Sequence, residues 1–479
     1  MKIKNAKQNG FTLQSAASDD NGSFWIKRLQ MKSIRFTRGY NIKISGQPAP
    51  EVQYLHKPTR LALLPERIPF VKPRLKVKIG DTVQLGSPLM EDKRNSEIQF
   101  LSPGGGKIVD IIFGPRRVIR EIVIRLDDEE RQVEFESLPA SDIKKIDRDQ
   151  LIRRIVNGGL WPLIRELPFR DYPSPDTLPP AIYVSLGNLE PFQPLPEIYL
   201  ADRRELFEYG LKVLGRLSAD RIHVCAPQTN TAIQRQLNGI ITLTYSGNYP
   251  VHDPGVLVYH MKTSTEENRT WYVGGQDVLL MAHLLKYGAY PTHRTVALAG
   301  SCARVKKHFH TRLGAPLAHI TDDRIDEGDI RYIEGGVLTG YAGSAHTYLG
   351  FFETALNLLP EGNEKGELLG LFRPGYRKPS YSRVFLSALN RENLEMNCSV
   401  HGGDRACIAC GYCAQVCPVD ILPQFTYKAI LAGEVEESLE HGLLDCVECG
   451  LCSYVCPSKI ELFETLKNAK ADFYKEKTA

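Results

Sequence analysis

The chain has 479 residues, of which 42% are hydrophobic and 24% are charged, and its formal net charge at pH 7 is +4. This length and ordinary composition are typical of several globular domains with cores of their own. The small net charge, without a basic stripe carrying interleaved aromatic residues, argues against a nucleic-acid-binding protein. The longest apolar stretches, such as residues 278–282, are far shorter than the ~20 residues that cross a bilayer. We therefore expect no transmembrane segment.

The first part of the chain changes from a polar segment to an all-β pattern. Residues 1–30 show no periodicity and are predicted to be an N-terminal extension. In residues 31–136, short strands are separated by turns such as Gly80-Asp81 and Gly86-Ser87. This pattern resembles the barrel-sandwich fold of biotinyl and lipoyl carrier domains. Lys93 lies near the position of a carrier's modified lysine, but the usual flanking residues are absent, so we predict an unmodified lysine in a solvated turn.

Residues 137–294 have the pattern of a Rossmann-like α/β domain. Segments 181–186 and 221–225 have the apolar character of buried strands, and segments 206–217 and 277–287 have helical spacing. Neither a GxGxxG fingerprint nor a GxxxxGK[ST] loop is present, so a nucleotide site is not indicated. The glycine pair before the second helix is interpreted as turn geometry.

Residues 295–389 are predicted to hold a β-grasp domain and a linker. His308 and His310 lie two residues apart on one face of a predicted strand, but no third ligand completes a metal site. We interpret them as structural histidines. We find no nucleophile–base constellation anywhere in the chain, so catalytic residues are left unassigned.

Two cysteine runs of the form C-x2-C-x2-C-x3-C-P dominate residues 390–479. They contain eight of the eleven cysteines, at the spacing with which bacterial two-cluster ferredoxins hold [4Fe-4S] clusters. In that arrangement the first three thiolates of a run hold one cluster, and the fourth reaches across to the other. The predicted ligands are Cys407, Cys410, Cys413 and Cys456 for the first cluster, and Cys446, Cys449, Cys452 and Cys417 for the second. Short helical patterns between the runs predict an all-α domain.

Other uses of these cysteines fit the spacing less well. Structural zinc sites use two CxxC pairs per metal and need neither a third cysteine at the same step nor the x3-C-P ending. Disulfides are typical of exported chains, and no signal-peptide core follows the N-terminus. Of the other cysteines, Cys225 is predicted to be a core thiol, and Cys398 lacks the spacing of a ligand.

The order of these units resembles two related proteins, the A subunit of the sodium-translocating NADH:quinone reductase and the C subunit of the Rnf ferredoxin:NAD oxidoreductase. The similarity to the reductase A subunit covers about residues 31–470. Its local matches are residues 31–46, 77–92, 331–340, 345–350, 372–375, 384–387 and 450–457. Familiar A subunits have lost most cluster cysteines, whereas this chain keeps all eight, as the Rnf C subunit does. The Rnf turn associated with NADH and flavin corresponds to residues 248–254, which lack its glycine and glutamate.

The resemblance implies a multidomain α+β chain. Its expected parts are a barrel-sandwich domain, a Rossmann-like domain, a β-grasp domain of the SLBB type and an all-α helical ferredoxin-type domain. The expected function is that of a peripheral electron-transfer subunit, with two [4Fe-4S] clusters, on the cytoplasmic side of the inner (plasma) membrane.

The enzyme complex implied by the resemblance is a translocase that couples electron transfer from NADH to quinone with Na⁺ translocation. Its other subunits are the expected partners, and quinone is the substrate of the whole complex. Two alternatives stay open. One is an Rnf-type C subunit that exchanges electrons with NADH, and the other is a docking subunit whose clusters are structural.

Overall fold

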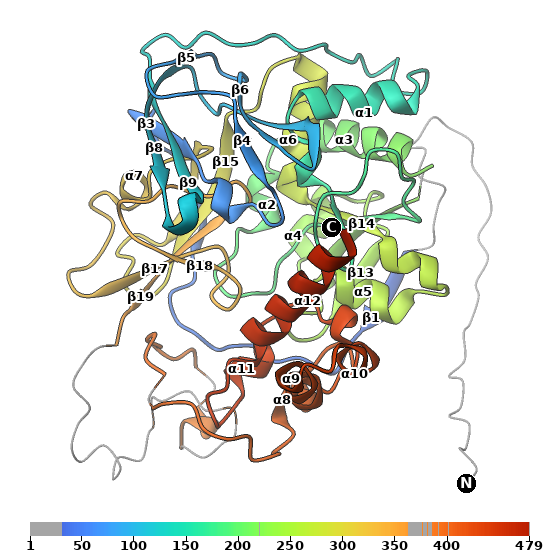
Figure 1. Cartoon of the computed structure of the whole chain (residues 1–479), viewed down its shortest axis with the longest axis vertical. Helices are drawn as coiled ribbons and strands as arrows, with labels where there is room; N and C mark the ends of the chain where they lie inside the picture. Colours follow the sequence, from blue (N-terminus) through green and yellow to red (C-terminus); the bar gives the residue numbers. More distant parts are fainter. Residues whose placement is uncertain are drawn as a thin grey trace.

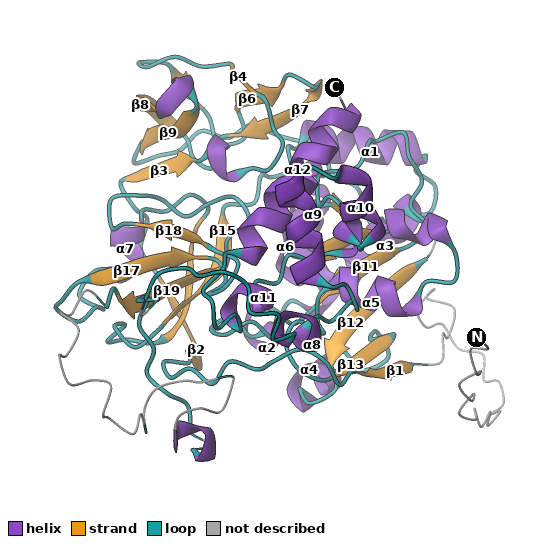
Figure 2. Ribbon diagram, turned by 60° about the horizontal axis from the view of Figure 1, so that its bottom comes forward, coloured by secondary structure: helices purple, strands orange, loops and turns teal. Residues whose placement is uncertain are grey.

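The computed structural model describes residues 31–219, 221–362, 376, 381, 386–390, 392–400 and 402–478. The predicted extension, residues 1–30, lies outside the described residues, and so does the matched segment 372–375. Figure 1 shows a blue and cyan β unit at the upper left, a green α/β unit at the right, a yellow and orange sheet at the lower left and a red helical module at the lower centre. Figure 2 shows from a second side that the helical module lies against the α/β unit.

Two small antiparallel sheets form the β unit, with strand orders β3-β9-β8-β5 and β4-β6-β7. Its elements are β3 (Arg60–Leu63), η1 (Pro65–Arg67), β4 (Pro73–Leu75), β5 (Thr82–Val83), β6 (Pro88–Asp92), β7 (Asn95–Leu101), β8 (Gly106–Phe113), η2 (Pro115–Arg117) and β9 (Ile119–Leu126). Alternating side chains such as those of Leu61, Phe100 and Ile122 are fully buried, as expected when one face of each sheet covers the other. The predicted barrel-sandwich architecture is confirmed.

The β6–β7 turn, which holds Lys93, is anchored to the α/β unit. Arg94 donates hydrogen bonds to Asp92 and Asp171, and Tyr172 donates to Asp92 at 2.7 Å. The Lys93 side chain is exposed. Lys93 thus lies in a solvated turn, as predicted, and its unmodified state stays a prediction.

The α/β unit is a mostly parallel sheet with the order β1-β13-β12-β11-β14-β10. Its strands are β1 (Lys32–Arg35), β10 (Arg165–Glu166), β11 (Ile182–Ser185), β12 (Ile222–Pro227), β13 (Leu243–Ser246) and β14 (Trp271–Gly274). Its helices are α1 (Arg148–Asn157), η3 (Trp161–Leu163), α2 (Pro196–Tyr199), α3 (Arg204–Leu217), α4 (Thr231–Gln236), α5 (Pro254–Met261), η4 (Thr265–Arg269) and α6 (Gly275–Tyr287). The central strands are short apolar runs, as parallel strands buried on both faces require. The predicted strands and helices of this region are confirmed.

The third unit is a mixed sheet with the order β18-β17-β19-β15-β16-β2. Its elements are β2 (Ala49–Tyr54), β15 (His293–Ala299), β16 (Lys307–Arg312), α7 (Leu317–Thr321), β17 (Ile330–Glu334), β18 (Tyr341–Gly343) and β19 (Ala355–Pro360). His308 lies in β16, fully buried, with its two ring nitrogens bonded to Ala49 O and Leu195 N. It is a satisfied core histidine, as predicted.

Two N-terminal strands lie outside the unit to which the prediction assigned them. The prediction placed all of residues 31–136 in the barrel-sandwich domain. In the structure, β1 pairs in parallel with β13 and β2 pairs in parallel with β16. Short, half-exposed strands carry no local pattern that identifies a partner so distant in sequence. The predicted domain boundaries near residues 136, 294 and 389 stay predictions.

The C-terminal module consists of short helices and one long one. They are η6 (Leu386–Leu389), α8 (Tyr412–Val416), α9 (Pro423–Ala432), α10 (Val435–Glu440), η7 (Leu443–Asp445), α11 (Leu451–Tyr454) and α12 (Leu462–Thr478). The short helix α9 begins at a proline in its first turn and ends at Gly433, which has a left-handed conformation. Both are usual helix boundaries, and they fit the predicted pattern of short helices between the cysteine runs.

A buried carboxyl group lies where the first and third units meet. Glu334, at the end of β17, is 1% exposed, and its carboxylate lies 3.6 Å from the guanidinium of Arg67. Burial raises the pKa of Glu334 to about 7, against the opposing effect of Arg67, and nearby Glu353 adds to the increase. The folded chain therefore binds a proton here at pH values where an unfolded chain has lost it.

This carboxyl group predicts a pH dependence of stability. Because the folded pKa of Glu334 is raised, its contribution is present below the unfolded pKa and is lost as the pH rises through about 7. Glu334→Gln should flatten this slope and raise stability at pH 8 relative to wild type by about 3 kcal/mol. Urea-unfolding midpoints from pH 5 to 8 measure the effect, with exposed Glu129→Gln as the control. Parallel curves for wild type and Glu334→Gln would contradict the assignment.

Candidate metal centres

The two cysteine runs share one backbone shape. Ala409 and Glu448, which precede the second cysteine of each run, have φ values of 54° and 56°. Gly411 and Gly450, which follow that cysteine, both have φ of 76°. Left-handed backbone is unfavourable for residues other than glycine, so its repetition at equivalent positions indicates a shared local requirement. In both runs a short helix, α8 or α11, begins directly after the glycine.

The first predicted group of cysteines lines one cavity. Its lining includes Cys407, Cys410 and Cys413 of the first run together with Cys456 and Pro457 of the second. Cys407 and Cys410 are exposed to solvent, whereas Cys413 is buried. The structure thus brings together three cysteines of one run and the fourth of the other.

The second predicted group is gathered in the same way. Cys417 belongs to an apolar cluster against which Cys446 and Cys449 pack. Desolvation raises the pKa of Cys452 well above its usual value, and the nearby thiols of Cys449, Cys446, Cys417 and Cys413 raise it further. Cys417 therefore lies near the first three cysteines of the other run, and Cys413 of the first group also lies close to Cys452.

Each group has the donors that a [4Fe-4S] cluster needs. Desolvation raises the pKa of Cys417 to about 12, although the backbone N–H groups of Val419 and Ile421 point at its sulfur and lower the pKa. Such N–H groups are the usual hydrogen-bond donors to cluster sulfurs. Among the described residues, no three His, Cys, Asp or Glu side chains converge as ligands of a single ion. Since each thiolate of a cubane binds a different iron, the groups fit a cluster by number, donor type and hydrogen bonding.

A buried lysine holds the second run. Lys470 on α12 is 2% exposed, and its ammonium donates to Cys446 O at 2.7 Å and to Glu448 Oε1 at 2.9 Å. Desolvation alone would raise the pKa of Glu448, but the charges of Lys470 and Arg170 hold it below its usual value. The ion pair therefore fixes the left-handed turn of the second run.

Two side chains of the α/β unit bind the same run from the other side. Arg170 donates to Asp253 at 2.9 Å and to Val447 O at 3.1 Å. Tyr249 is buried, and its hydroxyl donates to Cys449 O at 2.8 Å. Segment 248–254, which corresponds to a nucleotide-associated turn in the resemblance, thus contacts the cysteine module. Sequence reasoning did not find Arg170 and Lys470, because each resembles any other surface cation in its local pattern.

The carboxyl edge of the parallel sheet, where open α/β folds bind nucleotides, is filled by the chain's own side chains. Tyr199 is buried, and its hydroxyl donates to Leu186 O at 2.9 Å. At the start of α6, Asp277 accepts from the N–H of Gly274 and forms an ion pair with Arg294 at 2.6 Å. A carboxylate therefore occupies a helix N-terminus of the kind that binds phosphate.

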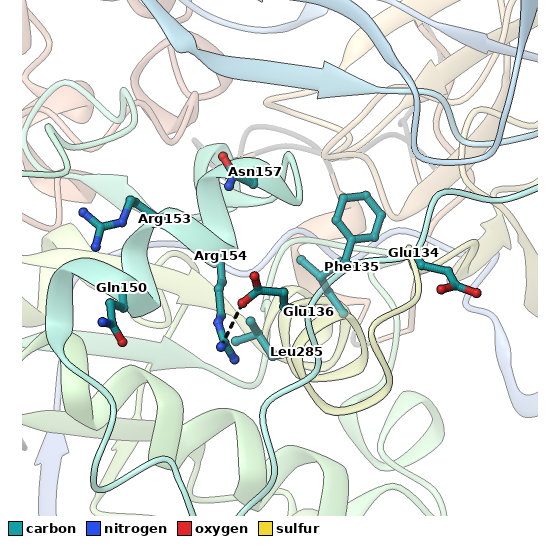
Figure 3. Close-up of a pocket in the computed structure, with 9 residues that line it drawn as sticks. Glu134, Phe135, Glu136, Gln150, Arg153, Arg154, Asn157 and Leu285 are labelled. Carbon is teal, nitrogen blue, oxygen red and sulfur yellow. Dashed lines mark ion pairs between the residues drawn. The ribbon is translucent and has the colours of Figure 1, made fainter.

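Two hollows are distinct from the cavity of the first cysteine group. A groove of about 540 Å³ separates the α/β unit from the module, and Cys446, Val447, Tyr259 and Tyr474 form part of its wall. Figure 3 shows the other hollow, between α1 and residues 134–136, where Arg154 and Glu136 point toward one another and form an ion pair. The nine residues that line the second hollow do not belong to the cysteine module.

The remaining cysteines lie apart from both groups. Cys225 is fully buried in β12, as predicted for a core thiol. Cys398 packs at the edge of an apolar cluster beside the third unit.

No helix among the described residues has the length and apolar character needed to span a membrane.

Sequence comparisons agree with the observed units. Residues 34–127 match the family described as the NqrA N-terminal barrel-sandwich hybrid domain, and residues 146–290 match the NqrA second alpha/beta domain. Residues 295–344 match the NQRA C-terminal domain, and residues 406–460 match a 4Fe-4S dicluster domain. The predicted fold class is therefore confirmed.

Curated relatives match over most of the chain. The A subunit of the Na(+)-translocating NADH-quinone reductase of Yersinia pestis bv. Antiqua (strain Angola) is 34% identical over 86% of this chain and 92% of its own length. Its counterpart from Glaesserella parasuis serovar 5 (strain SH0165) is 32% identical with the same coverage. A solved structure of NAD+-reducing [NiFe]-hydrogenase in the H2-reduced state covers 71% of this chain and 64% of its own, at 13% identity and a TM-score of 0.38.

The second run supplies a test of its buried ion pair. Lys470→Met leaves the Glu448 carboxylate and the Cys446 carbonyl without a partner, and breaking such a pair should destabilise the fold by about 3 kcal/mol. Adding Glu448→Gln should restore at least half of the loss. Calorimetric unfolding midpoints under anaerobic conditions measure both, with exposed Lys475→Met as the control. A wild-type midpoint for Lys470→Met would show that the pair contributes nothing.

The comparisons and the geometry lead to the same identification. The three NqrA-type units follow one another along the chain, and the dicluster match covers all eight cysteines of the two runs. The chain belongs to the family of the A subunit of the Na+-translocating NADH-quinone reductase, with a 4Fe-4S dicluster domain at its C-terminal end.

Proposed function

We propose that this chain is a peripheral electron-transfer subunit of a membrane-bound NADH:quinone reductase that couples electron transfer to Na⁺ translocation. The observation that supports the proposal most is the grouping of four thiols around one cavity, three from the first run and Cys456 from the second. A [4Fe-4S] cluster takes up and releases one electron at a time. Two such clusters form a short path for single electrons through the module.

The chain's own residues have defined tasks in this proposal. The eight cysteines ligate two clusters, with Cys417 and Cys456 crossing between the runs. Backbone N–H groups donate to the sulfurs, and Lys470 and Arg170 place positive charge beside the second run. Such contacts set the potential of a cluster.

The rest of the reaction belongs to the assembled complex. The relatives bear the name of one subunit of a reductase, which supports other subunits as partners. In the proposal, NADH and quinone react at those partners, and the chain lies on the cytoplasmic side of the membrane. An Rnf-type exchange of electrons with NADH on this chain is less well supported, because Asp277 occupies the helix N-terminus where a phosphate would bind.

The filled sheet edge predicts weak nucleotide binding. A pyrophosphate at the start of α6 would meet the Asp277 carboxylate, and like charges oppose binding there. Calorimetric titration of the purified chain with NADH up to millimolar concentration should show no saturation in the micromolar range. The apo chain is titrated in parallel so that heat from cluster reduction is not mistaken for binding. A micromolar dissociation constant would favour the Rnf-type alternative.

The proposed ligation predicts metal content and its dependence on single cysteines. Anaerobically purified protein should contain about eight irons and eight sulfides, as two cubanes require. Cys417→Ser should damage the cluster on Cys446, Cys449 and Cys452, because a serine oxygen is a poorer ligand for iron than a thiolate.

Low-temperature spin resonance distinguishes the two possible pairings. With crossed ligation, the spectrum of Cys417→Ser should match that of Cys449→Ser, and the first cluster should persist in both. If it matches Cys410→Ser instead, each run holds its own cluster. Stoichiometric zinc without sulfide would refute the proposal altogether, and clusters that cannot be reduced would favour a structural role.

A further inference from the structure

The two halves of the cysteine module share a backbone shape but differ in what covers them. Ile408 and Val447 occupy the same position, directly after the first cysteine of each run. Ile408 is 67% exposed, whereas Val447 is 7% exposed. Since both are β-branched aliphatic residues, the difference comes from their surroundings and not from their chemistry.

Val447 is buried because the α/β unit docks on the second run. A β-carbon at Gly255 would lie 2.9 Å from Val447 Cγ1, so the glycine at the start of α5 makes room for the valine side chain. Arg170 donates to Val447 O in the same contact. The side chain of Val447 is therefore covered by the α/β unit, while Cys446 beside it borders the groove between that unit and the module.

The glycines of the two runs show the same contrast. A β-carbon at Gly450 would lie 3.1 Å from both the Cβ and the carbonyl oxygen of Leu338, which belongs to the third unit. A β-carbon at Gly411 would meet nothing within 4 Å. Val447 and Gly450 of the second run are thus in contact with other units of the chain. At the equivalent positions of the first run, Ile408 and Gly411, the described residues make no such contact.

The uncovered loop lies directly over the first cysteine group. Ile408 stands between Cys407 and Cys410, both exposed and both lining the first cavity. A single exposed aliphatic residue is ordinary on a protein surface. This one is distinguished by a buried counterpart at the equivalent position and by its place between two proposed cluster ligands.

We propose that the loop 407–411 is the docking surface for another subunit of the reductase, one that carries a one-electron cofactor. This inference rests on the proposed function. It identifies loop 407–411 as the interface through which electrons pass to or from the first cluster. The partner surface is apolar, with a small residue that receives Ile408 as Gly255 receives Val447. One electron crosses the interface in each step, and no bond forms or breaks.

Chemistry favours a different subunit over a second copy of this chain. Two copies meeting at this loop would bring identical clusters together, and identical potentials give no driving force for net transfer. The neighbouring exposed residues Asp404 and Arg405 carry opposite charges, so long-range charge contributes little. The contact should therefore be small, as weak electron-transfer interfaces are, and only weakly dependent on salt.

The first experiment locates the partner. A photo-cross-linking amino acid is placed at position 408 of the full chain in the assembled complex, and at exposed Leu178 of the α/β unit as the control. The proposal predicts an adduct between position 408 and one cofactor-bearing subunit, and no such adduct from position 178. Adducts only with a second copy of this chain, or none at all, would overturn it.

The second experiment measures electron transfer. Ile408→Glu should slow NADH-driven reduction of the clusters in the complex by at least tenfold, without changing iron content or reduction by dithionite, and by more than the measured change in cluster potential accounts for. Ile408→Val, which copies the second run, should give a rate between those of Ile408→Glu and wild type, and Leu178→Glu should react at the wild-type rate. A wild-type rate for Ile408→Glu would refute the proposal that electrons cross at loop 407–411. Absence of iron from the wild-type chain would instead refute the proposed function, and the cross-linking result would still report on docking.

Discussion

The cost of gathering buried thiols is the constraint on which the C-terminal module depends. Desolvation holds the pKa of Cys417 and Cys449 above the usual value, even though backbone N–H groups point at both sulfurs. The chain alone therefore does not favour thiolates at these positions. In the proposed ligation, iron supplies the missing positive charge, because a thiol loses its proton when it binds a metal. With crossed ligation, neither half of the module closes without the other.

The same constraint connects the module to the rest of the chain. The second run is held by Lys470 from α12 and by Arg170 from the α/β unit. Further along α12, Tyr474 stacks on Phe169 at 4.4 Å and donates to Asp171 at 3.0 Å. The last helix therefore belongs to the metal module at one end and to the interface between units at the other. If the second run holds a cluster as proposed, loss of that cluster should loosen this interface as well.

Local spacing decided what the sequence could predict. The cysteine runs are local patterns, so both ligand sets could be predicted. The structure lines one cavity with the first set and packs Cys446 and Cys449 against the cluster that contains Cys417, and the crossed ligation stays a prediction. The left-handed turns at Ala409 and Glu448 were not predicted, because neither residue type favours that conformation. Lys470 looks like any lysine of an exposed helix, and its burial depends on a partner 22 positions earlier in the chain. The partners of β1 and β2 are separated from them by more than 200 residues, beyond the reach of any local pattern.

The α/β unit shows why the site and not the fold determines function. Its parallel sheet is of the kind that binds nucleotides at the carboxyl edge. Here the Glu190 carboxylate at that edge accepts hydrogen bonds from the backbone of Leu338 and Thr339, at 2.7 and 3.0 Å. Leu338 in turn packs against Gly450 of the second run, and Tyr249 from a neighbouring loop of the edge bonds Cys449 O. The carboxyl edge of the sheet thus supports the second cysteine run. These contacts give the edge a structural role that requires no phosphate-binding motif.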